Sequence, residues 1–400
     1  MNLTFEEFVP NYYLRVLLSM ILAFGITYRS IPVIINVCNL KGLMAEKEKR
    51  SSHEYPTPTF GGIAIFASTL IAYHVWNFGD EGILMHRVIV GFIILFFLGI
   101  KDDLFALSPI KKINSQVVSA ALVVIGSDLR ITDFFGIFGI YEIPYVISVG
   151  LTIFIYIALI NAINLIDGID GLAGGVGLIV TGIFGAWFLV NGHFSLASLS
   201  LCLSSSLAGF LIYNFSKTNK IFMGDTGSLI LGFVITTLAV KFIHFNVMHS
   251  FRTNMFVNAP VLAIVLLSVP IFDTLRVFAI RIMRGKSPFK PDRIHMHHLV
   301  VDNGLNHIQA SFTFYAYTLI ATGLTYWLRH HLSNTQLCIV IVGYFILYLL
   351  VGYWLENRRF ALKKNQIKAQ FETEKEKNQG SSIVRFKTED EPTPMMIKQN

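Results

Sequence analysis

The chain has 400 residues, of which 54% are hydrophobic and only 14% are charged, and its formal net charge is +7. Soluble domains carry about 25% charged residues, and the mean hydropathy here is +0.59, so the composition excludes an ordinary soluble protein. Three isolated cysteines predict neither a disulfide framework nor a metal knuckle. We attribute the positive charge to membrane topology and expect no nucleic-acid partner.

Apolar runs of membrane-spanning length recur along the chain and predict an all-α polytopic membrane protein embedded in the lipid bilayer. The fourth run is the shortest and least regular. We expect eleven transmembrane helices, at about residues 12–37, 59–78, 86–100, 114–127, 145–162, 172–190, 195–213, 227–245, 258–280, 310–328 and 335–355.

The connections between these spans differ in positive charge. The odd-numbered connections hold 14 Lys and Arg residues, whereas the even-numbered ones hold four if Arg87, at the start of the third span, is counted with them. Positive charge stays on the cytoplasmic side, so we expect the N-terminus outside and the C-terminus inside. Residues 1–355 would form the membrane domain. Residues 356–400 are rich in Lys, Glu and Gln and predict a disordered cytoplasmic tail.

The third cytoplasmic connection carries the sequence NAINLIDGIDG, residues 161–171. Asn161, Asn164 and Asp167 would share one helix face if the preceding helix continues that far. Side-chain oxygens of this kind suit Mg²⁺, which is bound by one or two carboxylates together with substrate phosphates. The alternative is a polar junction whose Asn and Asp side chains cap helix ends.

Two further cytoplasmic connections carry carboxylates. Asp102 and Asp103 are adjacent at a membrane boundary, which is costly unless they are solvated, paired or bound to metal, and their repulsion could raise one pKa and supply a base. Asp225 lies in GDTGS, residues 224–228, where a helix start suits a phosphate with a cation beside it. The alternatives are a loop neutralised by its lysines and an ordinary N-cap.

The ninth span contains a lone acid, Asp273, which is functional by default unless it pairs with Arg276 or Arg281. The connection that follows is rich in bases and histidines. It could bind a transition metal, but the absence of cysteine and the number of basic residues favour an anion. Its candidate residues are Arg281, Arg284, Lys286, Arg293, His295, His297 and His298.

Five motifs occur in order along the chain: HEYPTPTFGG, IKDDLFALSPIKKINSQ, NAINLIDGIDGLAGG, KIFMGDTGSLILG and SPFKPDRIHMHH. With these motifs the chain resembles, over about residues 10–355, the polyprenyl-phosphate N-acetylhexosamine-1-phosphate transferases. The last motif is similar to the branch that uses UDP-GlcNAc or a related UDP-sugar.

The resemblance implies an enzyme that transfers N-acetylhexosamine-1-phosphate from a UDP-sugar to undecaprenyl phosphate and releases UMP. It would start O-antigen or another cell-envelope polysaccharide at the cytoplasmic face of a bacterial inner membrane. GlcNAc is the expected sugar, GalNAc, FucNAc and MurNAc-pentapeptide are alternatives, and a homodimer is left open. The rival from another class is a transporter, which would place acids near mid-bilayer and often show two related halves. Here the acids cluster at one boundary and no repeat is visible.

The resemblance also implies roles for individual residues. Asp102 and Asp103 would lie at the lipid phosphate, and Asp225 would bind Mg²⁺, or alternatively Mn²⁺, with Asn164 or Asp167. Asp170 would organise the loop or a uridine pocket and, with Asp102, Asp103 and Asp167, makes up the expected catalytic set. The implied substrate-binding residues are Lys112, Asn161, Asn214, Arg281, Arg293, His295, His297 and His298.

Overall fold

The computed structural model describes residues 11–43, 57–76, 82–248, 256–287 and 294–387. Arg293 and the part of the first motif before Thr57 lie outside these residues. Within them the chain is helical and has no strand, only an isolated bridge between Asp133 and Glu142. The helices are α2 (Tyr12–Lys41), α3 (Gly61–Trp76), α4 (Gly82–Leu104), α5 (Pro109–Val124), α6 (Tyr145–Ile166), α7 (Leu172–Val190), α8 (Phe194–Asn214), α9 (Gly224–Met248), α10 (Ala259–Leu266), α11 (Ser268–Met283), α12 (Met296–Asp302), α13 (His307–Leu328) and α14 (Asn334–Lys387).

Each of the eleven predicted spans falls on a helix or, for the ninth, on a pair of helices. By length and composition, seven described helices could cross a membrane, or eight if α10 and α11 together count as one crossing. The all-α polytopic class is therefore confirmed. The number eleven stays a prediction, because α3, α5 and α13 are not among these crossings. Helices α3 and α5 have 16 residues each, or about 24 Å of helix against a hydrocarbon core of about 30 Å. The sidedness also stays a prediction.

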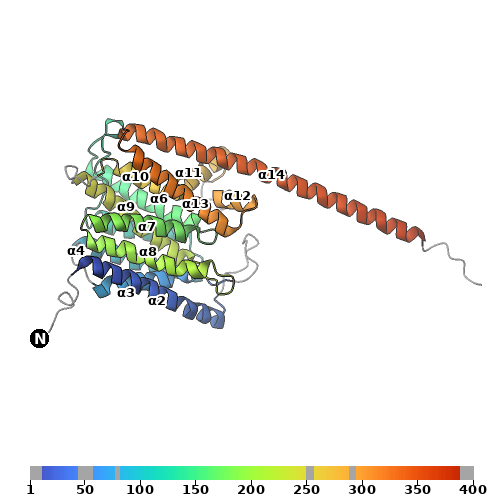
Figure 1. Cartoon of the computed structure of the whole chain (residues 1–400), viewed down its shortest axis with the longest axis horizontal. Helices are drawn as coiled ribbons and strands as arrows, with labels where there is room; N and C mark the ends of the chain where they lie inside the picture. Colours follow the sequence, from blue (N-terminus) through green and yellow to red (C-terminus); the bar gives the residue numbers. More distant parts are fainter. Residues whose placement is uncertain (1–10, 44–56, 77–81, 249–255, 288–293, 388–400) are drawn as a thin grey trace, which may run out of the picture. The chain divides into compact units, whose positions relative to one another are not determined.

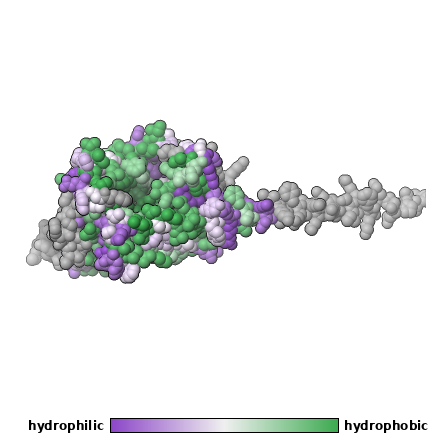
Figure 2. Space-filling view, turned by 90° about the horizontal axis from the view of Figure 1, so that it is seen from above, coloured by the Kyte–Doolittle hydropathy of each residue, from purple (hydrophilic) through white to green (hydrophobic). Residues whose placement is uncertain are grey.

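The protein divides into two compact units, Met1–Leu349 and Leu350–Asn400. In the first, α2, α8 and α7 pack side by side (Figure 1). Figure 2 shows hydrophobic residues over much of one face of this unit, with hydrophilic ones gathered toward its ends. Large apolar side chains such as Phe97, Phe154 and Ile320 are exposed, as expected for helices whose solvent is a bilayer.

Helix α9 lies at the centre of the first unit. It packs against α3, α4, α6 and α7, and 89% of its most apolar stretch is buried. Glycines allow the close approach. A β-carbon at Gly99 of α4 would lie 2.3 Å from Thr226 Cα, and one at Gly62 of α3 would lie 2.2 Å from the nitrogen of Gly227. These contacts fix the start of α9 against the ends of α3 and α4.

The predicted ninth span, 258–280, is not one continuous helix. It breaks at Leu267 into α10 and α11, whose axes differ by 72°. Pro270 explains the break, because proline lacks an N–H and its ring clashes with the carbonyl four residues earlier, here that of Leu266.

The predicted disordered tail differs from the structure over part of its length. Helix α14 continues past residue 355 to Lys387. The Lys, Glu, Gln and Ala residues that lower the hydropathy of this segment are also strong helix formers, which accounts for the difference. Residues 388–400 lie outside the described part.

Candidate active site

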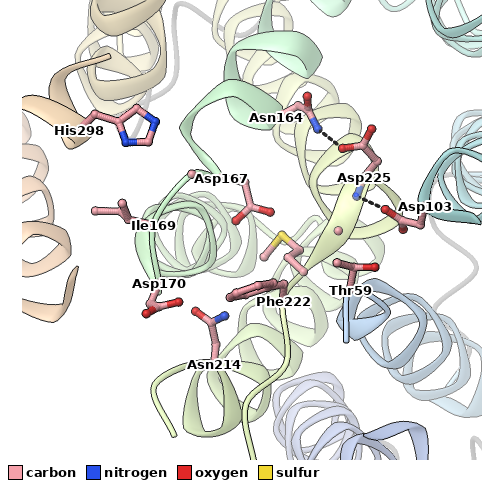
Figure 3. Close-up of a pocket in the computed structure, with 13 residues that line it drawn as sticks. Thr59, Asp103, Asn164, Asp167, Ile169, Asp170, Asn214, Phe222, Asp225 and His298 are labelled. Atoms are coloured by element: carbon pink, nitrogen blue, oxygen red, sulfur yellow. Dashed lines mark hydrogen bonds between the residues drawn. The ribbon is translucent and has the colours of Figure 1, made fainter. Parts of the chain in front are cut away.

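A cavity of about 340 Å³ opens where residues of all five motifs meet (Figure 3). The end of α4, the turn between α6 and α7, and the start of α9 contribute carboxylates to it. Seven of the fourteen predicted site residues line this one cavity, although they are far apart in sequence. The lining residues are Thr59, Asp103, Asn164, Asp167, Gly168, Ile169, Asp170, Asn214, Phe222, Met223, Gly224, Asp225 and His298.

Asp103 holds the start of α9. Its carboxylate accepts hydrogen bonds from the backbone nitrogens of Asp225 (2.7 Å) and Thr226 (3.0 Å) and from the Thr226 hydroxyl. These N–H groups lie at the N-terminus of a helix and have no partner within it, so they favour a negative charge there. Gly224, at φ 71°, leaves room for this contact, because a β-carbon there would lie 2.8 Å from the Asp103 carboxylate.

Lys112 joins the carboxylates of Asp102 and Asp225. Its ammonium donates to Asp102 and, at 2.7 Å, to Asp225. Burial alone would lower the pKa of Lys112, but attraction to Asp225 and Asp102 outweighs it and raises the pKa. Lys112 is therefore a permanent positive charge between two acids, and Asp102 also accepts from the backbone nitrogen of Leu107 at 2.7 Å.

Asn164 orients Asp225 through the carboxylate oxygen that Lys112 does not contact. Its side-chain nitrogen donates to Asp225 and to the Ser228 hydroxyl, both at 2.8 Å. In this arrangement the amide nitrogen of Asn164 positions Asp225.

Asp167 is half-buried and lies among like charges. Burial first, and then the negative charges of Asp225, Asp103 and Asp170, raise its pKa well above the usual value. A bound cation would remove that repulsion.

Asp170 is tied to α13 and to the segment before α9. His307 Nδ1 (2.9 Å) and Lys220 (2.6 Å) both contact its Oδ2. Burial alone would raise the pKa of Asp170, but these hydrogen bonds and charges hold it below the usual value. Ser311 and Tyr315 of α13 donate to the backbone oxygens of Asp170 and Gly171, so α13 braces the whole turn.

The two remaining amides of the prediction have different environments. Asn214 lines the cavity, accepts from the Gly171 nitrogen at 2.6 Å and donates to the Ile221 oxygen at 2.8 Å. Asn161 does not line the cavity. It pairs with Gln116 of α5 at 2.7 Å and donates to the Ile157 oxygen.

The three histidines before and within α12 form a row. His298 lines the cavity, and the buried ring of His297 lies against Gly168, where a β-carbon would come within 2.4 Å of its Nε2. Burial lowers the pKa of His297 to about 3, so this ring is neutral near pH 7. His295 is bonded to Asp273 of α11 at 2.7 Å. Arg281 is buried in α11.

The cavity has the donors that a hard divalent cation requires. Asp167 and Asp225 both line it, and the field of neighbouring carboxylates on Asp167 is one that a cation would balance. Among the described residues, no three His, Cys, Asp or Glu side chains already converge as a metal cage. An incomplete set of one or two carboxylates fits Mg²⁺ best, because Mg²⁺ keeps waters and takes further oxygens from substrate phosphates.

Sequence reasoning assigned no role to four residues that brace or line the site. His307 and Lys220 both reach Asp170, and Thr59 and Phe222 line the cavity. Of these four, only His307 lies outside the five motifs. The local signal near His307 was the capping box of Asn306 and Gln309, which predicts where α13 begins but not what its first residue contacts.

Comparison with known proteins places the chain in a family. The model of glycosyl transferase family 4 matches residues 85–243, which include the acid pair, the α6–α7 turn and the start of α9. The undecaprenyl-phosphate alpha-N-acetylglucosaminyl 1-phosphate transferase of Haemophilus influenzae is 30% identical over 84% of this chain and 93% of its own length.

Two further relatives carry similar names. A probable undecaprenyl-phosphate N-acetylglucosaminyl 1-phosphate transferase of Bacillus subtilis is 31% identical over 74% of this chain and 82% of its own length. The Salmonella typhi undecaprenyl-phosphate alpha-N-acetylglucosaminyl 1-phosphate transferase is 28% identical over 79% and 84%. With relatives matched over nearly their full length and the acid motifs assembled around one cavity, the chain belongs to the transferases of glycosyl transferase family 4.

Proposed function

We propose that this protein transfers N-acetylglucosamine-1-phosphate from UDP-GlcNAc to undecaprenyl phosphate and releases UMP. The observation that carries the proposal is the cluster of four carboxylates and one lysine at the end of apolar helices, in a chain similar to enzymes of that name. A phosphate on a membrane lipid can reach only a site at such a boundary. The same reaction could use another UDP-sugar, so the identity of the donor must be measured with a panel of UDP-sugars.

The reaction joins two anions. An oxygen of the lipid phosphate attacks the phosphorus that carries the sugar. A new P–O–P bond forms, the bond to the UMP oxygen breaks, and UMP leaves with that electron pair. The barrier is chiefly electrostatic, so fixed positive charge near the reacting phosphates accelerates the reaction.

Lys112 supplies one such charge, held in place by Asp102 and Asp225. Asp225 and Asp167 would hold Mg²⁺, which when bound neutralises phosphate charge. Asp102 does not line the cavity itself, and we propose that it acts at the lipid phosphate through Lys112, which it contacts. Asp103 serves as a positioning residue, because its oxygens hold the start of α9 and hence Asp225.

The donor would occupy the rest of the cavity. Asn214, His298 and the turn containing Asp170 line that part, and Arg281, His295 and the predicted residue Arg293 would add bases for the diphosphate. The charge distribution of the connections supports a site on the cytoplasmic face of a bacterial inner membrane, where nucleotide sugars are made.

The test is turnover by the purified protein in detergent with undecaprenyl phosphate, Mg²⁺ and a panel of UDP-sugars, measured as UMP and as lipid product. We expect UDP-GlcNAc to give the highest kcat/KM and chelation of Mg²⁺ to stop turnover. Asp225→Asn should lose activity while the protein still folds, because the change keeps volume and Asp102 remains to pair with Lys112, whereas the charge that Mg²⁺ needs is gone. The proposal is refuted if none of the UDP-sugars yields UMP. It is also refuted if Asp225→Asn turns over at a near-normal rate at low Mg²⁺.

A further inference from the structure

Asp273 is a buried carboxylate that the reaction described above does not use. It lies in α11 with 2% of its surface exposed. Its Oδ2 contacts His295 Nδ1 at 2.7 Å, and its Oδ1 accepts from the backbone nitrogen of Met296 at 2.7 Å and, more weakly, from the Tyr348 hydroxyl at 3.4 Å. A buried carboxylate is costly unless hydrogen-bonded, and here its bonds go to the segment that begins α12.

The contact with His295 has a chemical consequence. A carboxylate can only accept, so the proton on His295 must sit on Nδ1. Nε2 is then the one ring nitrogen that can meet a ligand, and the ring plane is fixed by the same bond. Carboxylates orient metal-binding histidines in the same manner.

A series of contacts leads from this pair to the cavity. The His295 ring stacks on that of His297 at 5.6 Å between centroids, and His297 lies 4.3 Å from the ring of His298. His297 also abuts Gly168, and both Gly168 and His298 line the cavity. Arg276 donates to the Ile294 oxygen at 2.6 Å, which holds the backbone just before His295.

We propose that Asp273 is a positioning residue for donor binding: it sets the tautomer and orientation of His295 and, through the stacked histidines, the cavity wall that receives the UDP-sugar. The proposal rests on the proposed function, since it names the ligand as the nucleotide-sugar donor. It assigns Asp273 no contact with substrate. Its effect must therefore pass through His295.

The experiment is a double-mutant cycle on Asp273→Asn and His295→Ala. Asparagine keeps the size of the side chain but can donate to Nδ1, which favours the opposite tautomer. We expect Asp273→Asn to raise the KM and the calorimetric Kd for UDP-GlcNAc by roughly ten- to a hundredfold, the range for losing a hydrogen bond to a charged group, with kcat changed less than threefold.

The cycle separates positioning from simple support of the fold. In the His295→Ala background, Asp273→Asn should change the donor KM less than twofold, because the group through which it acts is gone. The matched control is Asp128→Asn, which makes the same chemical change in an exposed pair with Arg130 and should leave the donor KM unchanged. Additive effects in the two backgrounds, or a wild-type KM in Asp273→Asn, would overturn the proposal.

A second variant decides the matter if Asp273→Asn does not fold. In His295→Asn the amide nitrogen replaces Nδ1 and keeps the bond to Asp273, but nothing replaces Nε2. We expect this variant to fold and to bind UDP-GlcNAc at least tenfold more weakly, and binding equal to wild type would overturn the proposal. Wild-type protein that turns over no UDP-sugar would instead refute the proposed function itself.

Discussion

Asp170 shows how a single carboxylate can be fixed by its partners. Its two side-chain partners, Lys220 and His307, come from segments 50 and 137 residues away, and its backbone oxygen accepts from Ser311 at 2.6 Å. The side chain lines the cavity, yet its Oδ2 already contacts Lys220 and His307. We therefore infer that Asp170 organises the α6–α7 turn, which is one of the two roles expected from the family resemblance.

This role makes a pH-dependent prediction. Asp170→Asn should lower the free energy of unfolding by about 2 kcal/mol near pH 7, because it removes a charged hydrogen-bond partner from the half-buried Lys220. The folded-state pKa of Asp170 is lowered, so its contribution is complete above the unfolded value of about 3.9 and is lost as pH falls through the folded value.

The measurement is thermal or denaturant unfolding in detergent at several pH values. The wild-type advantage should be full at pH 7 and should shrink as pH falls below about 3.9. Asp128→Asn, in a pair whose carboxylate is 65% exposed, should cost no more than about 1 kcal/mol. A stability difference that stays constant down to pH 3 would show that the charge of Asp170 is not what stabilises the turn.

At the scale of elements, the site depends on how closely α4 and α9 approach. Gly99 lies one turn before the acid pair, and a β-carbon there would collide with the backbone of Thr226. Thr226 therefore makes two contacts with α4: its backbone packs against Gly99, and its nitrogen donates to Asp103, as does that of Asp225. Helix packing and acid geometry are set by the same residues.

We expect Gly99→Ala to reduce kcat at least tenfold and to lower Tm. The added methyl must move α9 away from α4, and displacements of about 1 Å at reacting groups can cost a hundredfold in rate. Gly25→Ala is the matched control, because nothing lies within 4 Å of a β-carbon there. It should keep full activity and gain up to about 1 kcal/mol from better helix propensity. Wild-type kcat and Tm in Gly99→Ala would contradict this account.

At the scale of the whole molecule, apolar periodicity predicted the helices because each span is a local property of the sequence. It also predicted that the acid motifs lie on one side of the membrane, because the connections that carry them alternate with the other connections along the chain. It did not predict that Asp103 caps a helix beginning 121 residues later, or that His307 contacts Asp170. Those contacts depend on how helices pack, and neither residue carries a local pattern that reports its partner.

The assignment of the site to the cytoplasmic face rests on charge alone and can be tested directly. Single cysteines at Ser108 and Thr218 would report on the end of the helices that carries the cavity, and a cysteine at Tyr141, which is 64% exposed, on the other end. The native Cys338 is partly accessible, whereas Cys38 and Cys202 are buried, so the background should carry Cys338→Ser.

In intact cells an impermeant thiol reagent should label position 141 and spare positions 108 and 218, which should react only after the membrane is opened. Since 14 of the Lys and Arg residues in the connections lie on the cavity side and four on the other, the opposite labelling would mean that the charge rule fails for this chain. The lipid phosphate and the nucleotide sugar would then have to meet outside the cell.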